Sequence, residues 1–177
     1  VLWLTGLPGA GKTTIARALA SRLSAAGAAV ELIDGDAMRQ RFPGTGFTRA
    51  DRDAHVQRVG HLASRLEAHG VTVVASLVSP YRDSRALVRQ ACRRFVEIHV
   101  ATDLAECERR DPKGLYRKAR AGEITQFTGF DEPYEPPEAA EIVIDTTTES
   151  ADAAAARVLD WLRQPALVVG ATTGGAP

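Results

Sequence analysis

The stretch Gly6-Leu7-Pro8-Gly9-Ala10-Gly11-Lys12-Thr13 decides the fold of this chain. It matches the pattern G-x-x-x-x-G-K-[ST], and it stands between an apolar run at residues 1–5 and an Ala/Leu-rich run at residues 12–26. Its glycines let the backbone curl so that N–H groups point inward around phosphate oxygens, and the following helix adds its positive N-terminal end. A glycine-rich turn with an incidental lysine is the alternative. Because a strand precedes the motif and a helix follows it, we favour a phosphate-binding loop.

This loop predicts a site for a nucleoside triphosphate with Mg²⁺. Lys12 is expected to reach the β- and γ-phosphates, and the Thr13 hydroxyl to ligate the metal. The motif alone does not separate a kinase from a GTPase or a motor. No guanine-reading Asn/Lys-x-x-Asp motif follows a later strand, and the chain is short, so we favour a small-molecule kinase. The expected nucleotide-binding residues of the loop are Gly6, Gly9, Ala10, Gly11, Lys12, Thr13 and Thr14.

The apolar periodicity alternates between strand and helix character along the rest of the chain. Short apolar strands separated by helices predict a parallel sheet that is covered on both faces. We therefore expect an α/β, three-layer P-loop NTPase fold with a parallel five-stranded sheet. The predicted strands are 1–5, 29–33, 71–76, 95–100 and 141–145, and the predicted helices are 12–26, 48–69, 81–92, 103–110 and 151–162.

Length and composition suggest one domain and restrict its partners. The 177 residues fit a single kinase domain at 1–163, in which the polar segment 111–137, rich in Gly and Pro, forms a lid, followed by a flexible tail or linker at 164–177. A net charge of zero argues against nucleic acid as a partner, and no apolar run approaches the ~18 residues of a membrane span. Two cysteines favour a reducing cytoplasm. Because Val1 already lies in an apolar strand, we expect a piece of a longer chain.

Ligands of such sheets bind at the carboxyl ends of the strands, so the residues after each strand are candidates. Asp34 and Asp36 follow the second strand, where two carboxylates can hold Mg²⁺ or accept a proton from an attacking hydroxyl. A tight turn with a helix N-cap is the alternative. Ser79 follows the third strand and could contact an acceptor, cap the next helix, or do both.

A cluster of arginines follows the carboxylates. Guanidinium groups beside a strand-end cleft suit an anionic acceptor, because their donors pair bidentately with phosphate or sulfate. Composition alone favours the alternative, a solvated helix face paired with nearby acidic residues. The cluster comprises Arg39, Arg41, Arg49, Arg52 and Arg58.

The chain resembles the adenylylsulfate kinases over residues 1–162. The longest shared stretch is D-P-K-G-L-Y-R-K-A-R-A-G-E at 111–123, which is peculiar to that family. The phosphate loop and the segments around Asp36, Phe47 and Ser79 also match it. The remaining matching segments are Asp51 with Arg52, residues 127–131 and residues 133–138.

The resemblance implies transfer of the ATP γ-phosphoryl group to the ribose 3′-hydroxyl of adenosine 5′-phosphosulfate. It implies that Asp36 receives the hydroxyl proton. The expected metal ligands are Thr13, Asp34 and Asp36, and the expected catalytic residues are Lys12, Asp36 and Ser79. We favour direct in-line transfer, and a phosphoserine intermediate at Ser79 is the alternative. By the same resemblance Arg39 and Arg52 hold the phosphosulfate, and Phe47 and Phe127 sandwich the adenine. Arg109 and Arg110, with the segment after Asp111, close over ATP. The further acceptor-site residues that it implies are His55, Val78, Ser79, Lys113 and Leu115. Family members form homodimers, and some are fused to, or work with, an ATP sulfurylase.

Four positions depart from the family pattern. Ala37 and His55 stand where asparagines are usual, Gln57 stands where an arginine is common, and Pro8 replaces a common serine. We expect His55 to replace an amide donor and to introduce a pH dependence near neutrality. Ordinary drift is one explanation of these changes. The alternatives are a related kinase that acts on another anionic nucleotide or metabolite, and a non-catalytic nucleotide-binding module of a sulfate-activating complex.

Overall fold

A computed structural model describes residues 1–42 and 44–164 of the chain. Its centre is a sheet of five parallel strands in the order β2-β3-β1-β4-β5. The strands are β1 (Leu2–Thr5), β2 (Val30–Asp34), β3 (Thr72–Ser76), β4 (Val96–Val100) and β5 (Ile142–Ile144). The predicted α/β fold class and its five parallel strands are confirmed, and the strand ends differ from the predicted ones by one residue or less.

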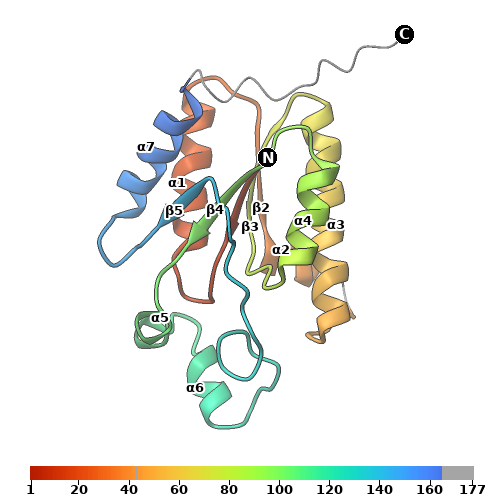
Figure 1. The fold of residues 1–177 in the computed structure, drawn as a ribbon, viewed down its shortest axis with the longest axis vertical. Coiled ribbons are helices and arrows are strands. Elements are labelled where there is room, and N and C mark those ends of the chain that lie inside the picture. Colours follow the sequence, from red (N-terminus) through yellow and green to blue (C-terminus); the bar gives the residue numbers. More distant parts are fainter. Residues whose placement is uncertain (43, 165–177) are drawn as a thin grey trace.

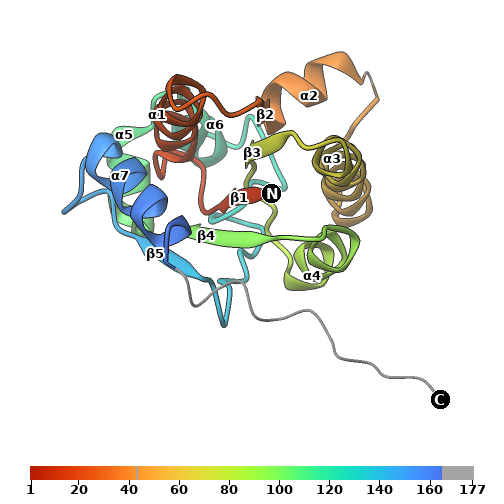
Figure 2. The same ribbon diagram turned by 90° about the horizontal axis from the view of Figure 1, so that it is seen from above.

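Helices cover both faces of the sheet (Figures 1 and 2). On one face α1 (Lys12–Ala25) and α7 (Ala151–Leu162) pack together, and on the other α3 (Arg49–Ala68) packs against α4 (Arg82–Ala91). Side chains of a strand alternate between the two faces. Accordingly, Leu2 and Leu4 of β1 join the core beneath α1 and α7, while Trp3 joins the core beneath α3 and α4. Both cores are apolar, which makes the sheet a rigid base for the site.

The remaining helices lie at the carboxyl edge of the sheet. Helix α2 (Gly35–Arg41) follows β2 directly, whereas α5 (Leu104–Arg110) and α6 (Leu115–Arg120) lie below the sheet in Figure 1, with the coil that leads to β5. Sequence reasoning did not find α2 or α6. Both are short, and each depends on an aspartate outside its periodic residues. Asp34 accepts from the backbone N–H groups of Asp36 and Ala37, and Asp111 accepts from those of Tyr116 and Arg117.

Helix α3 begins as the sequence predicts. Thr48 accepts a hydrogen bond from the backbone N–H of Asp51, and the Asp51 carboxylate accepts one from the N–H of Thr48, which together form a capping box. Within the described residues no helix is both long and apolar enough to cross a membrane. The predicted tail at 164–177 lies outside the described residues except for Gln164.

Candidate functional site

The loop between β1 and α1 has the backbone geometry that its glycines predict. Gly9 and Gly11 have φ angles of 80° and 96°, in the left-handed region that side chains disfavour. A Cβ on Gly9 would lie 2.9 Å from the carbonyl oxygen of Cys107, so the loop also packs closely against α5. Lys12 is buried at the start of α1, and its Nζ donates to the carbonyl oxygens of Gly6, at 2.9 Å, and Leu7, at 2.8 Å. Burial lowers the pKa of Lys12 to about 8.

The hydroxyl groups of two threonines, Thr102 and Thr146, bind the main chain of the phosphate loop. The carbonyl oxygen of Ala10, which is fully buried, accepts from Thr102 and from Thr146, each at 3.1 Å. Arg110 donates to the Thr146 hydroxyl at 2.6 Å, so α5 and the segment after β5 are tied to the same loop. Thr14 lies exposed in the first turn of α1.

The loop and the end of β2 meet at an oxygen-rich cluster. The Thr13 hydroxyl donates to Oδ2 of Asp34 at 3.0 Å and lies 3.2 Å from the Ser76 hydroxyl. Hydroxyl and carboxylate oxygens are the donors that Mg²⁺ prefers, and Thr13 with Asp34 therefore fits such an ion. No group of three or more His, Cys, Asp or Glu side chains in the described part of the chain is arranged to hold a metal by itself, so water and phosphate oxygens would have to complete the coordination.

Asp36 is held by a residue from the 111–137 segment. Lys113 forms an ion pair with the Asp36 carboxylate, and both side chains are exposed. The same segment reaches the phosphate loop through Tyr116, whose hydroxyl donates to the carbonyl oxygen of Pro8 at 2.9 Å. Leu115, the first residue of α6, packs against the core beneath α1. The segment that sequence analysis predicted to be a lid thus contacts both the loop and Asp36.

Two predicted acceptor residues, Arg39 and Arg52, surround Phe47. Their guanidinium carbons lie 4.8 and 5.6 Å from the centre of its ring, which is 54% exposed. Phe127, by contrast, is buried and packs edge-on against Tyr116 with ring centres 4.8 Å apart. Arg52 links the two aromatic residues, since its Nε donates to the carbonyl oxygen of Phe47 and its terminal nitrogens donate to Gln126 and Thr128.

The environment of Ser79 does not suit a catalytic residue. Ser79 is buried, its hydroxyl accepts from Nε1 of Trp3 and donates to Thr5, and its φ is 39°. The structure therefore gives Ser79 a structural role in the turn after β3. The neighbouring residue Val78 contributes its carbonyl oxygen, which accepts from the Thr5 hydroxyl at 2.8 Å.

His55 also differs from its expected behaviour. It is buried, and its Nε2 lies 3.1 Å from the carbonyl oxygen of Gly35. Within the described residues its Nδ1 has no hydrogen-bond partner. Burial, helped by nearby Arg39, lowers the pKa of His55 to about 4. The expected pH dependence near neutrality is therefore wrong, because a histidine with this pKa is already neutral there.

Arg109 points to a neighbour on its own helix. It forms a bidentate pair with Glu106, with both N···O distances 2.6 Å, and its side chain is 72% exposed. The structure does not bring Arg109 to the phosphate loop. Arg110, the next residue, is linked to the loop instead, because it donates to the hydroxyl of Thr146, which donates to the carbonyl oxygen of Ala10.

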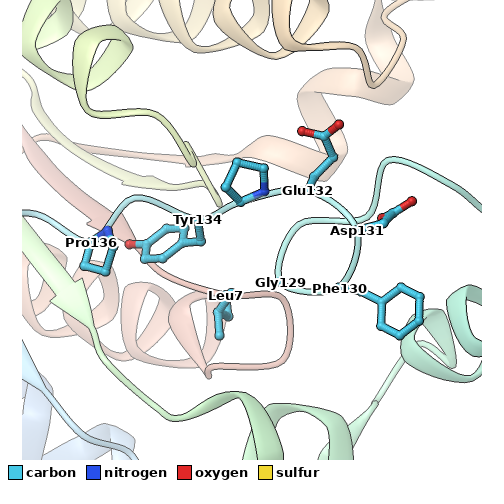
Figure 3. A pocket seen from close by; sticks show the side chains of 8 residues that line it. Leu7, Gly129, Phe130, Asp131, Glu132, Tyr134 and Pro136 are labelled. Carbon is cyan, nitrogen blue, oxygen red and sulfur yellow. The ribbon is translucent and has the colours of Figure 1, made fainter.

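An open pocket adjoins the phosphate loop. Its volume is about 480 Å³, and it is lined by Leu7, residues 129–134 and Pro136. Figure 3 shows Leu7 of the loop beside the curl of chain through Gly129, while the Phe130 ring extends away from it. The Arg120 guanidinium lies 5.4 Å from that ring. The Tyr134 hydroxyl lies 3.0 Å from the hydroxyl of Thr5, the residue that precedes the loop.

Sequence reasoning missed the residues that hold the end of the 111–137 segment. Arg85 is buried and donates to Glu97, to the carbonyl oxygen of Ser79 and to that of Glu135. Arg82 donates to the carbonyl oxygen of Pro136 at 2.8 Å. The only signal was a pair of arginines three positions apart at the start of a helix, which is common on solvated surfaces.

The phosphate loop, the carboxylates after β2 and the contacting 111–137 segment define a P-loop nucleotide-binding protein. A family model described as adenylylsulphate kinase matches residues 1–145. The adenylyl-sulfate kinase of Synechococcus sp. (strain JA-3-3Ab) is 50% identical over 163 residues, which are 92% of this chain and 93% of that protein. The chain belongs to the adenylylsulphate kinase family.

Solved structures agree with this assignment. The Mycobacterium tuberculosis APS kinase CysC in complex with AMPPNP and APS is 39% identical, with a TM-score of 0.88 over 92% of this chain and 96% of that one. A hexameric APS kinase from Thiobacillus denitrificans is 38% identical, with a TM-score of 0.67 over 91% of this chain and 28% of that one. The similarity therefore extends over nearly all of the described residues.

Proposed function

We propose that this adenylylsulfate kinase transfers the γ-phosphoryl group of ATP to the ribose 3′-hydroxyl of adenosine 5′-phosphosulfate. The observation that carries the assignment of roles is the contact between Asp36 and Lys113 beside the Thr13–Asp34 cluster. This contact joins the phosphate loop, the carboxylates after β2 and the 111–137 segment in one place. A donor phosphate and an acceptor hydroxyl bound there would be adjacent.

On the donor side, loop N–H groups and Lys12 neutralise the phosphates of ATP. Thr13 and Asp34 would hold Mg²⁺, with Asp36 nearby, and the ion would supply charge neutralisation on the β- and γ-phosphates. The oxygen-rich contact between Thr13 and Asp34 supports this role. Of Arg109 and Arg110, we assign the role near the nucleotide to Arg110. It donates to the hydroxyl of Thr146, which in turn donates to the carbonyl oxygen of Ala10 in the phosphate loop.

On the acceptor side, Phe47 and Phe127 hold the adenine by stacking, which is worth about 1–3 kcal/mol per base. The exposed ring of Phe47 supports this role. Phe127 is buried in the present arrangement, so its face becomes available only when the 111–137 segment moves. Arg39 and Lys113 would meet the phosphosulfate, and His55 and Val78 would lie beside the bound acceptor.

The transfer is a direct in-line displacement. The 3′-oxygen bonds to the γ-phosphorus, the bond from that phosphorus to the β–γ bridging oxygen breaks, ADP leaves, and Asp36 receives the hydroxyl proton. Because the Ser79 hydroxyl is buried between Trp3 and Thr5, a phosphoserine intermediate is not part of this proposal. The 111–137 segment acts as the lid of a single domain at 1–163 and excludes water that would hydrolyse ATP.

The test is ADP release with adenosine 5′-phosphosulfate and with other adenine nucleotides as acceptors, in the parent and in Lys12→Ala, Ala37→Asn and His55→Asn. We expect turnover with adenosine 5′-phosphosulfate and none in Lys12→Ala. Faster turnover with another acceptor, reversed by the two asparagine variants, would favour a related kinase. No turnover with any acceptor would favour a nucleotide-binding module.

The finer assembly and location also remain proposals. We infer a homodimer that works with, or is fused to, an ATP sulfurylase, which supplies adenosine 5′-phosphosulfate. The cytoplasm is the proposed compartment, and the free cysteines Cys92 and Cys107 support it. Sedimentation of the full chain, alone and with an ATP sulfurylase, tests both associations.

A further inference from the structure

One carbonyl group of the phosphate loop takes no part in the hydrogen bonds of α1. The first carbonyl oxygen that the helix uses is that of Gly11, which accepts from the N–H groups of Thr14 at 3.1 Å and Ile15 at 3.2 Å. The carbonyl oxygen of Ala10, one residue earlier, accepts from no main-chain N–H in the described part of the chain. Ala10 is fully buried, so this oxygen cannot turn to water. Its partners must be side chains.

Two threonine hydroxyls are these partners, and a charged donor restricts the direction of their bonds. The hydroxyl oxygens of Thr102 and Thr146 each lie 3.1 Å from the Ala10 oxygen and 2.7 Å from each other. Nη1 of Arg110 donates to the Thr146 hydroxyl at 2.6 Å, and a guanidinium group can only donate. The Thr146 proton therefore goes to Ala10 or to Thr102. Because each hydroxyl has one proton, every arrangement of these bonds brings at least one proton to the Ala10 oxygen.

The peptide group that carries this carbonyl also carries the N–H of Gly11. In a planar trans peptide the C=O and N–H bonds point in nearly opposite directions. A carbonyl group that is held toward the two threonines therefore turns the Gly11 N–H away from them. Within the described residues this N–H has no acceptor. In this motif the N–H groups of the loop bind the phosphates of the nucleotide, so the orientation of this peptide group matters for binding.

The methyl group and the hydroxyl of Thr146 contact different atoms of the loop. A Cβ on Gly11 would lie 3.2 Å from the Thr146 methyl carbon, so the methyl group packs closely against Gly11. The hydroxyl, by contrast, bonds the Ala10 oxygen. Valine keeps the methyl group and loses the hydroxyl, whereas serine keeps the hydroxyl and loses the methyl group. The two substitutions therefore separate the hydrogen bond from the packing.

We propose that Thr102 and Thr146 are positioning residues for ATP, which orient one peptide group of the phosphate loop so that the N–H of Gly11 faces the phosphates. This inference rests on the proposed function, because it takes the loop as the ATP site. It also gives Arg110 a defined part, since the bond from Arg110 leaves the Thr146 proton free for the loop. Its consequence is that the threonine pair affects the nucleotide donor and not the acceptor.

Calorimetry on the full chain, with ADP and Mg²⁺, measures the dissociation constant in Thr102→Val, in Thr146→Val, in the double valine variant and in the corresponding serine variants. Each single valine variant should weaken ADP about threefold, because the other hydroxyl still reaches the Ala10 oxygen. The double valine variant should weaken it about thirtyfold, because the bond from an N–H to a charged phosphate is lost. The double serine variant should stay within twofold of the parent.

The matched control is Thr72→Val, the same exchange at the first residue of β3, at the sheet edge opposite the loop. It should bind ADP as the parent does. Equal losses in the double valine and double serine variants would overturn the inference, because they would show that packing and not the hydroxyl is needed. ADP binding at the parent's affinity in the double valine variant would overturn it as well.

Steady-state kinetics distinguishes a positioning role from general damage to the fold. In the double valine variant KM for ATP should rise, while KM for adenosine 5′-phosphosulfate should stay within twofold of the parent. A rise of both by the same factor counts against the inference. If the double valine variant does not fold, the single variants decide the question, and a single valine variant that binds ADP no more weakly than its serine counterpart contradicts the proposal.

Failure of the proposed function looks different from failure of this inference. If Lys12→Ala binds ADP as tightly as the parent, the loop is not the ATP site and the proposed function is wrong. If Lys12→Ala weakens ADP and the double valine variant does not, only the role of the two threonines is wrong.

Discussion

Nε of Arg85 lies 2.6 Å from Oε1 of Glu97 in a pair that is almost fully buried, and this pair joins the first turn of α4 to β4. The remaining donors of Arg85 reach the carbonyl oxygens of Ser79 and Glu135 at 2.6 and 2.7 Å. One guanidinium group thus fixes the turn after β3 and the end of the 111–137 segment.

Glu97→Gln should destabilise the fold by about 3 kcal/mol, because it leaves a buried guanidinium group without its counter-charge. Urea unfolding measures this change. The control is Asp160→Asn, which breaks the exposed pair between Asp160 and Arg163 and should change the free energy of unfolding by less than about 0.5 kcal/mol. Equal effects in the two variants would contradict the structural role of the buried pair.

The apparent affinity for ATP should fall as the pH rises above about 8. Lys12 has a pKa of about 8 when the loop is held by its own carbonyl groups, and bound phosphates raise that pKa. Above pH 8 the lysine has lost its proton and must regain it to bind ATP, so KM for ATP should rise about tenfold per pH unit. Below pH 8 it should be flat. Calorimetry in buffers of different ionisation enthalpy should detect proton uptake at pH 9 and none at pH 7.

Acid should destabilise the fold through His55. Its pKa is about 4 in the fold and 6.5 in the unfolded chain, so the unfolded chain binds the extra proton in that interval. The stabilisation is fully present above pH 6.5 and is lost as the pH falls toward 4, with about 2 kcal/mol gone by pH 5. Thermal unfolding at pH 7 and pH 5 measures it. His55→Asn should lose less stability over the same interval, and equal losses would rule out His55 as the cause.

Phe127→Leu should raise KM for adenosine 5′-phosphosulfate about tenfold or more and leave KM for ATP within twofold, because it removes a stacking face. Leucine keeps much of the buried volume beside Tyr116, so folding is less affected than it would be by alanine. Steady-state kinetics with each substrate varied in turn provides the measurement. Equal losses for both substrates would remove Phe127 from the acceptor site.

Much of the fold could be predicted because its signals are local. The glycine pattern from Gly6 to Gly11 dictates the loop, and apolar runs of four or five residues mark buried parallel strands. Helices α2 and α6 could not be predicted in the same way. Their residues show little periodicity. The carboxylates of Asp34 and Asp111 accept hydrogen bonds from backbone N–H groups at the start of each helix, which have no acceptor within the helix.

The site was less predictable because its side chains form hydrogen bonds with residues that are distant in sequence. Arg52 looked like an anion ligand, yet its partners Gln126 and Thr128 lie more than seventy residues away. Ser79 likewise looked available, and only the packing of Trp3 shows that it is not. A buried arginine such as Arg85 leaves no local signal, since its charge suggests a solvated surface.

The two carbonyl contacts of Lys12 make nucleotide entry an exchange rather than a simple addition. The ammonium group must leave the oxygens of Gly6 and Leu7 before it can turn to a phosphate, so the bonds that it gains are partly offset by bonds that it loses. The heat released on binding is then a difference between two sets of contacts. The same exchange favours departure of ADP, because the ammonium group can return to these two carbonyl oxygens as the nucleotide leaves.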